Sequence, residues 1–267
     1  MQVQSLGYRT ELIFPAFDGE IIDRGDYLVV KTPSNPTFYW GNFLLFSHPP
    51  EEGDYLKWQE LFNKEIGGPP VYEHKAFGWD TTGGEIGAAQ PFVESGFLLE
   101  VSSVLTARGK DLISKFSPDS SLRFLTSDDD WHQAIENQVA CREPIFSEAG
   151  YRVFRQRQMQ RYREMVSAGR GVWFGAFIGQ QLVADLGIFW EGELARYQSV
   201  QTHPNFRRRG IASALLFTAG KYALDHTDSD DLVIVSESGS EAERLYQGMG
   251  FQVKEQQVGL WISELSS

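Results

Sequence analysis

Three successive arginines, Arg207, Arg208 and Arg209, stand directly before Gly210, where apolar residues begin to recur at helical spacing. The start of a helix carries partial positive charge and unpaired N–H groups, so acidic residues normally stabilise it and neighbouring cations do not. Cations at this place, with Gly210 leaving room for close approach, fit a site that receives a polyanion such as a pyrophosphate. The alternative is a solvated basic turn.

The elements around this segment predict an α/β arrangement. Residues 172–178 and 181–190 are strand-like and are separated by a two-residue turn typical of a hairpin. A further strand over 194–202 ends just before the arginines, and Ile211 begins a helix. Upstream, residues 127–130 can cap a helix that starts at Trp131, and a second helix, over 148–168, carries five arginines that are typical of a solvated face.

Composition limits the function classes. The chain has 267 residues, 42% of them apolar, which is typical of a folded globular protein. Its formal net charge of -12 disfavours binding to nucleic acid or to an anionic membrane. The single cysteine, Cys141, excludes an intramolecular disulfide, and no group of Cys and His has metal-ligand spacing. We therefore expect a soluble, cytoplasmic protein without a metal ion.

A polar breaker segment over 116–121 separates two strand-like runs. It predicts two domains, over residues 1–118 and 119–267. Acidic residues outnumber basic ones in the first of these, whereas arginines concentrate in the second.

The second domain resembles the GNAT superfamily of N-acyltransferases. Arg207, Gly210 and Ala212 match the family's acyl-CoA signature, in which Gln or Arg, two variable residues, Gly, one variable residue and Gly or Ala follow a splayed strand. Near the C-terminus, residues 245–251 resemble the family's closing helix and turn. The resemblance covers residues 121–267 and implies a GNAT fold, a mixed and mostly antiparallel sheet flanked by helices.

The resemblance also implies roles for particular residues. The backbone of the strand end would pair with the pantetheine arm of acetyl-CoA, the acyl-donor substrate, like an added strand. Tyr246 would protonate the leaving thiolate, because a phenol stays protonated at neutral pH. The residues expected to bind the cofactor are Val200, Gln201, Thr202, Arg207, Arg208, Arg209, Gly210, Ile211, Ala212 and Ser213. An aromatic residue that only anchors the last helix is the alternative for Tyr246.

Two positions depart from the family pattern or stay open. Many members have an asparagine seven residues before the tyrosine, where this chain has Gly239, so a side-chain contact to coenzyme A would come from Ser238. The general base is either Asp185 or Glu237, each of which could instead be an ordinary surface carboxylate, and water-mediated deprotonation is a third possibility.

The N-terminal half resembles a reduced copy of the second domain. Residues 92–97 have the spacing of residues 246–251, but Phe92 stands in place of the tyrosine. A strand over 38–46 and a helix that opens with Glu51, Glu52 and Asp54 occupy the place of the phosphate loop, where these acids would repel pyrophosphate. We expect this domain to be non-catalytic.

The sequence therefore predicts an N-acetyltransferase in which a primary amine attacks acetyl-CoA directly through a tetrahedral intermediate. The expected acceptor is a small molecule rather than a protein, and the acidic N-terminal half favours a cationic amine. The alternatives are a non-catalytic acyl-CoA sensor or interaction module and, less favoured, a nucleotide-binding regulator. The sequence leaves the oligomeric state open.

Overall fold

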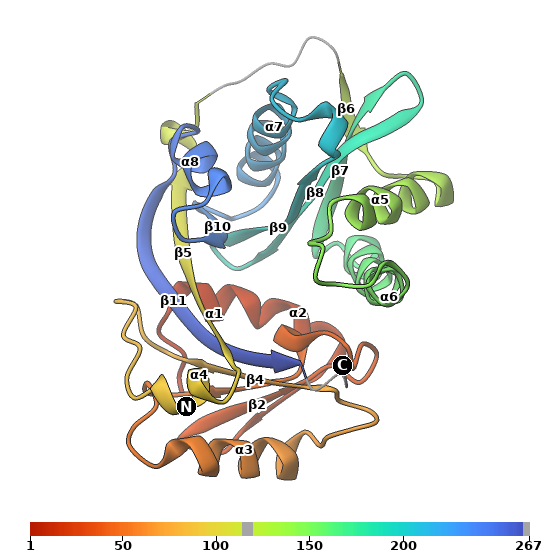
Figure 1. The fold of residues 1–267 in the computed structure, drawn as a ribbon. Helices are drawn as coiled ribbons and strands as arrows, with labels where there is room; N and C mark the ends of the chain where they lie inside the picture. Colours follow the sequence, from red (N-terminus) through yellow and green to blue (C-terminus); the bar gives the residue numbers. More distant parts are fainter. Residues whose placement is uncertain (114–119, 264–267) are drawn as a thin grey trace. The chain divides into compact units, whose positions relative to one another are not determined.

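The computed structural model describes residues 1–113 and 120–263 of the chain, and its elements form two compact units (Figure 1). Unit 1 contains Met1–Val104, Val235–Glu243 and Val253–Ser267, and unit 2 contains Leu105–Ile234 and Arg244–Gln252. The polar segment expected to divide the chain lies largely within 114–119, outside the described residues. The division into consecutive domains 1–118 and 119–267 stays a prediction.

Unit 1 is a twisted sheet with helices, and its sheet takes a strand from the far end of the chain. The strand order is β1-β2-β3-β4-β11, in which β3 and β4 are parallel and the other neighbours are antiparallel. Its elements are α1 (Leu6–Glu11), α2 (Ile13–Asp18), β1 (Glu20–Asp23), β2 (Tyr27–Lys31), the 3₁₀ helix η1 (Tyr39–Gly41), β3 (Phe43–Phe46), α3 (Asp54–Glu65), β4 (His74–Trp79), α4 (Gln90–Glu94), the first part of β5 (Leu98–Arg108) and most of β11 (Gln252–Ser263).

Both faces of this sheet are covered, which is why every residue of β3 is buried. Leu44 and Phe46 pack in the cluster that contains Trp58 and Phe62 of α3, whereas Phe43 and Leu45 pack with Tyr8 of α1. Alternate residues of a strand point to opposite faces, so an unbroken apolar run is the pattern of a strand that is buried on both sides.

The predicted strand over 38–46 is too long at its start. Residues 39–41 form η1, and the strand begins at Phe43. The amide of Asn42 donates to the carbonyls of Asn35 (3.0 Å) and Phe38 (2.9 Å), and its oxygen accepts from the N–H of Thr32 (2.8 Å). These side-chain bonds hold the segment in a turn that the apolar pattern does not reveal.

Unit 2 contains the predicted hairpin, strand and helix. Its strand order is β10-β9-β8-β7-β6, antiparallel except for the pair β9 and β10. The elements are the end of β5, η2 (Gly109–Asp111), β6 (Ser121–Phe124), α5 (Asp128–Ala140), α6 (Glu148–Ser167), β7 (Gly171–Ile178), β8 (Gln181–Glu191), β9 (Leu194–Thr202), η3 (Pro204–Phe206), α7 (Ile211–His226), the start of β10 (Asp231–Glu237) and the end of α8 (Glu241–Gln247). This mixed, mostly antiparallel sheet with flanking helices confirms the predicted fold class.

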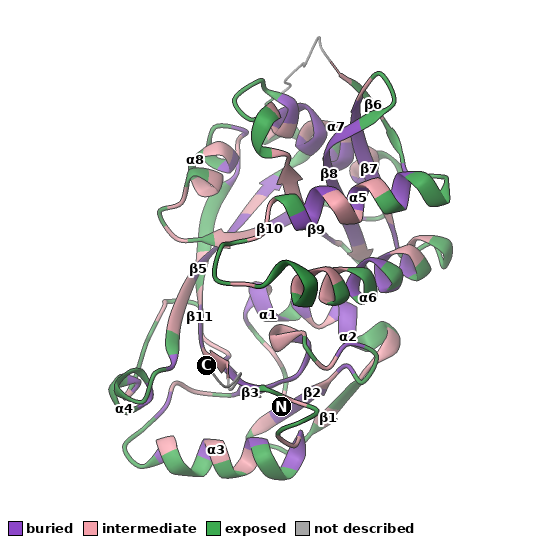
Figure 2. Ribbon diagram, turned by 45° about the vertical axis from the view of Figure 1, so that its right-hand side comes forward, coloured by how far each residue is buried: buried purple, intermediate pink, exposed green. Residues whose placement is uncertain are grey.

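The helices of unit 2 cover opposite faces of its sheet. On β7, Trp173 stacks on Tyr162 of α6 at 5.0 Å, and the next residue, Phe174, meets Tyr222 of α7 at 5.9 Å. Figure 2 shows the resulting burial along β7 and β8, whereas α5 and α6 have both buried and exposed sides. The sheet is therefore held between α5 and α6 on one face and α7 on the other.

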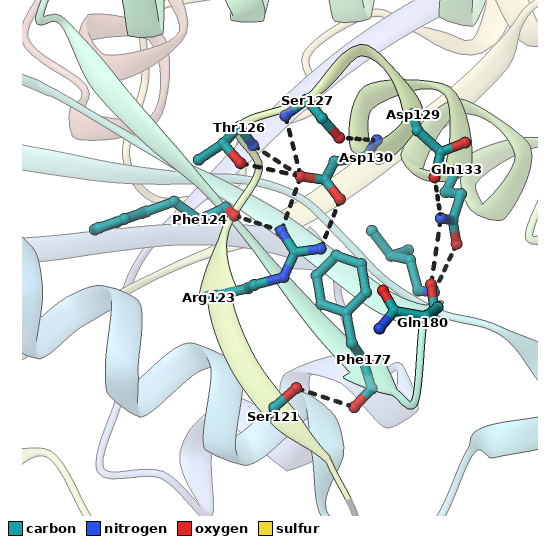
Figure 3. A network of polar contacts seen from close by, with 11 residues as sticks. Ser121, Arg123, Phe124, Thr126, Ser127, Asp129, Asp130, Gln133, Phe177 and Gln180 are labelled. Carbon is teal, nitrogen blue, oxygen red and sulfur yellow. Dashed lines mark hydrogen bonds and ion pairs between the residues drawn. The ribbon is translucent and has the colours of Figure 1, made fainter.

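The start of α5 is fixed by a polar network (Figure 3). Ser127 and Asp130 form a reciprocal capping box, and Arg123 of β6 donates two hydrogen bonds, of 2.7 and 2.8 Å, to the Asp130 carboxylate. The Arg123 hydrogen bonds hold the pKa of Asp130 well below its usual value. The helix therefore begins at Asp128 rather than at Trp131, because the three aspartates lie inside its first turn.

Candidate functional site

The carboxyl end of β9 is not paired with β10. The parallel ladder between the two strands ends at the pair Arg196 and Val233, but β9 continues to Thr202. Its register with β8 shifts between Asp185 and Gly187, and Ser199 adopts a positive φ of 51° at this bulge. The backbone of the predicted pantetheine-binding residues Val200, Gln201 and Thr202 therefore extends past the ladder.

The loop from β9 to α7 leaves the start of the helix without a side-chain cap. Gly210 is the N-cap residue with a φ of 75°, Arg208 has a φ of 64°, and the first turn contains no acidic residue. The N–H of Ala214 bonds to the Gly210 carbonyl at 3.1 Å, so the amides of residues 211–213 precede the first intrahelical bond. These are the predicted phosphate-binding residues Ile211, Ala212 and Ser213.

Arginine side chains surround this helix start. The Nε of Arg207 donates to the carbonyl of Thr202 at 3.2 Å, which ties the loop to the strand end. The guanidinium of Arg209 lies over the Phe206 ring at 5.2 Å. All three arginines are exposed. The structure thus brings the predicted cations and the uncapped amides together in one turn, an arrangement suited to an anion.

Tyr246 presents an unused hydroxyl. Its side chain is only 5% exposed, and among the described residues its hydroxyl makes no hydrogen bond. Burial raises the pKa of Tyr246, although the charge of Arg196 opposes the shift. The phenol is therefore protonated at neutral pH and has a proton to give to a ligand.

Asp185 lies inside unit 2 and is fully buried. Its carboxylate accepts from Asn137 (2.6 Å), Gln138 (2.8 Å) and the Trp173 indole (3.1 Å). Burial raises the pKa of Asp185 to about 7, although these donors oppose the shift. Gln138 also donates to the Ser199 carbonyl at 3.0 Å. The network therefore supports the β9 bulge.

The other two predicted site residues, Glu237 and Ser238, belong to unit 1. Glu237 is exposed at the end of β10. The N–H of Ser238 donates to the Val101 carbonyl at 3.1 Å, and its hydroxyl lies 2.9 Å from that of Ser103. The Glu237 carboxylate is therefore open to solvent, whereas the Ser238 hydroxyl is engaged by that of Ser103.

Sequence reasoning missed a group of residues beside the bulge, namely Gln138, Tyr151, Arg155 and Ser199. Arg155 is one of five arginines on α6 and nothing in the sequence separates it from the others. Ser199 carries no signal of its left-handed backbone, which is uncommon for a residue other than glycine.

Two negative findings concern the described residues 1–113 and 120–263. Within them, no three His, Cys, Asp or Glu side chains form a group that could hold a metal ion. In the same ranges, no helix is both long and apolar enough to cross a membrane.

Residues 169–253, which contain the β9 edge and the α7 start, match the acetyltransferase (GNAT) domain family. Within these residues the chain is similar to the GNAT superfamily. Acyl transfer is the chemistry of this superfamily. No curated protein is significantly similar to the chain in sequence.

Solved structures of other proteins share the fold over most of the chain. A functionally unknown conserved protein from Staphylococcus epidermidis is 17% identical with a TM-score of 0.76, covering 92% of this chain and 95% of its own. A GCN5-related N-acetyltransferase from Kribbella flavida is 13% identical with a TM-score of 0.65, covering 99% and 97%. A tandem GNAT protein from the clavulanic acid biosynthesis pathway is 12% identical with a TM-score of 0.53, covering 80% and 69%.

Proposed function

We propose that the chain is an N-acetyltransferase that moves an acetyl group from acetyl-CoA to a primary amine of a small molecule. The observation that carries the proposal is the uncapped, cationic start of α7 directly after the free edge of β9. One element suits the phosphates of coenzyme A, and the other suits an extended arm. An acidic or capped helix start would not suit the phosphates.

In the proposed complex, the amides of Ile211, Ala212 and Ser213 donate to the pyrophosphate, and Gly210 lets it approach closely. Arg207, Arg208 and Arg209 supply opposite charge. The backbone of residues 200–202 pairs with the pantetheine arm, as a strand pairs with an exposed sheet edge. Ser238 is the proposed side-chain contact to coenzyme A in place of the family's asparagine.

The reaction needs no covalent enzyme intermediate. The amine nitrogen bonds to the thioester carbon, the C–S bond breaks, and the electron pair leaves with sulfur. Tyr246 gives its proton to the departing thiolate, and a base takes the proton that the amine loses. Of the two predicted bases, Glu237 has the better access to solvent. Asp185 is enclosed by three donors, so we assign it a supporting role.

Acetyl-CoA titration of the variant Arg208→Glu, Gly210→Asp tests this assignment by calorimetry. Both changes put negative charge where the phosphates would bind, and charge-assisted hydrogen bonds contribute about 1.5–3 kcal/mol each. We expect the affinity to fall by about 100-fold or more. Arg157→Glu on the exposed side of α6 is the control for reversing the charge of one arginine, and it should bind normally.

An unchanged affinity in a correctly folded double variant, judged by circular dichroism, would remove the α7 start from the site. Coenzyme A release is then measured for the unmodified protein with a panel of amines. Binding of acetyl-CoA without release by any amine would contradict the enzyme assignment and favour an acyl-CoA sensor.

A further inference from the structure

A cationic side chain lies beside the β9 bulge, apart from the arginines of the α7 start. Arg155 of α6 is half-buried and donates to the Tyr151 hydroxyl from Nε (2.9 Å) and Nη2 (2.7 Å). Its Nη1 donates to Gln158 Oε1 and to Ser199 Oγ, the latter at 3.3 Å. Every partner is a neutral oxygen. Among the described residues, no carboxylate lies within ion-pair distance of Arg155.

The two hydroxyls at this arginine have protons to offer. The Tyr151 oxygen accepts twice from Arg155 and the Ser199 oxygen accepts once, but neither hydroxyl donates to any described residue. A guanidinium has five N–H donors, so the four contacts leave one of them, on Nη2, unused. Three donors around one positive charge suit an anionic oxygen pair.

The carboxylate of Asp185 interacts electrostatically with Arg155 but is a poor counter-ion. Asp185 is fully buried and already accepts from three neutral donors, as described above. Burial also raises its pKa to about 7, so its negative charge is incomplete at neutral pH. A half-buried cation without a full partner is costly, and an anionic ligand would relieve that cost.

The position of this group follows from the proposed cofactor site, on which the inference rests. With its phosphates at the α7 start, coenzyme A would extend its pantetheine arm back along β9, from Thr202 to Val200. The acyl end therefore points toward Ser199, the residue that Arg155 contacts. An acceptor amine that reaches the thioester lies next to the Arg155 group.

We propose that Arg155, with the hydroxyls of Tyr151 and Ser199, binds a carboxylate of the acceptor, so that the acceptor is an amine that carries an acid group, such as an α-amino acid. The rings of Tyr151 and Phe154, each 5.1 Å from the guanidinium carbon, flank the group. This reverses the preference for a cationic amine expected from net charge. The charge of Arg155, which touches the acceptor, outweighs that of acidic residues spread over another part of the chain. Salt screens electrostatic interactions over distances beyond roughly 8–10 Å.

The test compares α-amino acids with their amides as acceptors in full-length protein saturated with acetyl-CoA. The amide has the less basic amine, so intrinsic reactivity favours it and cannot produce a preference for the acid. We expect the unmodified protein to prefer acids. In Arg155→Gln, kcat/KM for acids relative to amides should fall about 10- to 100-fold, mainly through KM.

Arg157→Gln is the matched control, because Arg157 is exposed on the same helix and its removal should leave the ratio unchanged. Tyr151→Phe removes one donor and should lower the ratio less, which keeps the test valid if Arg155→Gln fails to fold. A preference for amides in the unmodified protein, or an equal loss for both acceptors in Arg155→Gln, would overturn the proposal.

Failure of the proposed function is recognised separately. If no acceptor releases coenzyme A, amino-acid binding to the protein saturated with coenzyme A is measured by calorimetry. Binding that weakens in Arg155→Gln but not in Arg157→Gln supports the carboxylate site without acetyl transfer. No binding, or equal binding by all three proteins, overturns it.

Discussion

The segments β3-α3-β4 and β9-α7-β10 share one architecture, and only the second has the features of a cofactor site. In each, a helix joins two parallel strands and begins after a glycine N-cap with positive φ, 93° at Gly53 and 75° at Gly210. The strands differ at their carboxyl ends. The β3–β4 ladder continues to Phe46 and Trp79, the last residues of both strands, whereas the β9–β10 ladder stops before β9 ends.

The two helix starts also differ in charge. At α3, the buried Asp54 accepts from the N–H of Glu51 at 2.9 Å, so an acid occupies the first turn. At α7, the first turn has no acid and arginines precede it. The same backbone thus serves ordinary helix stabilisation in one unit and can serve anion binding in the other.

The turns that follow α4 and α8 have the same backbone geometry but different aromatic residues. The N–H of Phe97 bonds to the Phe92 carbonyl at 3.0 Å, and the N–H of Phe251 bonds to the Tyr246 carbonyl at 3.1 Å. Gly96 and Gly250 have φ values of 96° and 99°. Phe92 is buried among the rings of Tyr55, Trp58, Phe77 and Phe97. This local match supports the hypothesis that unit 1 is a reduced copy. On that hypothesis, core packing around Phe92 takes the place of the proposed acid.

Tyr246→Phe should have the largest effect. It removes the proposed acid but no hydrogen bond to a described residue, so acetyl-CoA affinity and thermal stability should stay close to normal. Turnover should fall about 10- to 10,000-fold, the lower end if water replaces the phenol. Steady-state kinetics and calorimetry on the same preparation measure both. A normal rate would contradict the assignment of Tyr246 as the acid.

Phe92→Tyr is the reciprocal change and should act on stability instead. The new hydroxyl would lie in an aromatic cluster at a position with 0% exposure, where an unpaired polar group costs about 1–3 kcal/mol. Urea unfolding of this variant should show a lower midpoint with turnover retained at low temperature. If the variant were as stable as the unmodified protein, Phe92 would not be the core counterpart of Tyr246.

The smallest expected effect comes from neutralising the acidic helix start of unit 1. We expect one acetyl-CoA per chain by calorimetric titration, both before and after the change Glu51→Gln, Glu52→Gln. The paired ends of β3 and β4 and the core around Phe92 should exclude the pantetheine arm even when the acids are neutralised. A second equivalent bound by either protein would show that unit 1 kept a cofactor site.

Much of unit 2 could be predicted because its signals are local. The bounds of β9 and the first residue of α7 follow from the change of apolar period and from Gly210. The turn held by Asn42 could not be predicted, because its side-chain bonds to nearby backbone groups leave no trace in the apolar pattern. The bulge at Ser199 could not be predicted, because its carbonyl is held by Gln138, a residue distant in the sequence. Arg155 stands out only through its partners, which are brought together by folding.

The pairing of β11 with β4 has a consequence for biosynthesis. Gly259 lies opposite Gly78, about 180 positions earlier in the chain, and the Tyr8 hydroxyl donates to the Val258 carbonyl at 2.8 Å. At about 5–20 residues per second, the ribosome needs roughly 10–40 s to make the strand that covers this edge. During that time a nascent chain displays the unpaired edge of a strand that is buried in the finished protein, and an exposed edge of this kind can pair with other chains and aggregate.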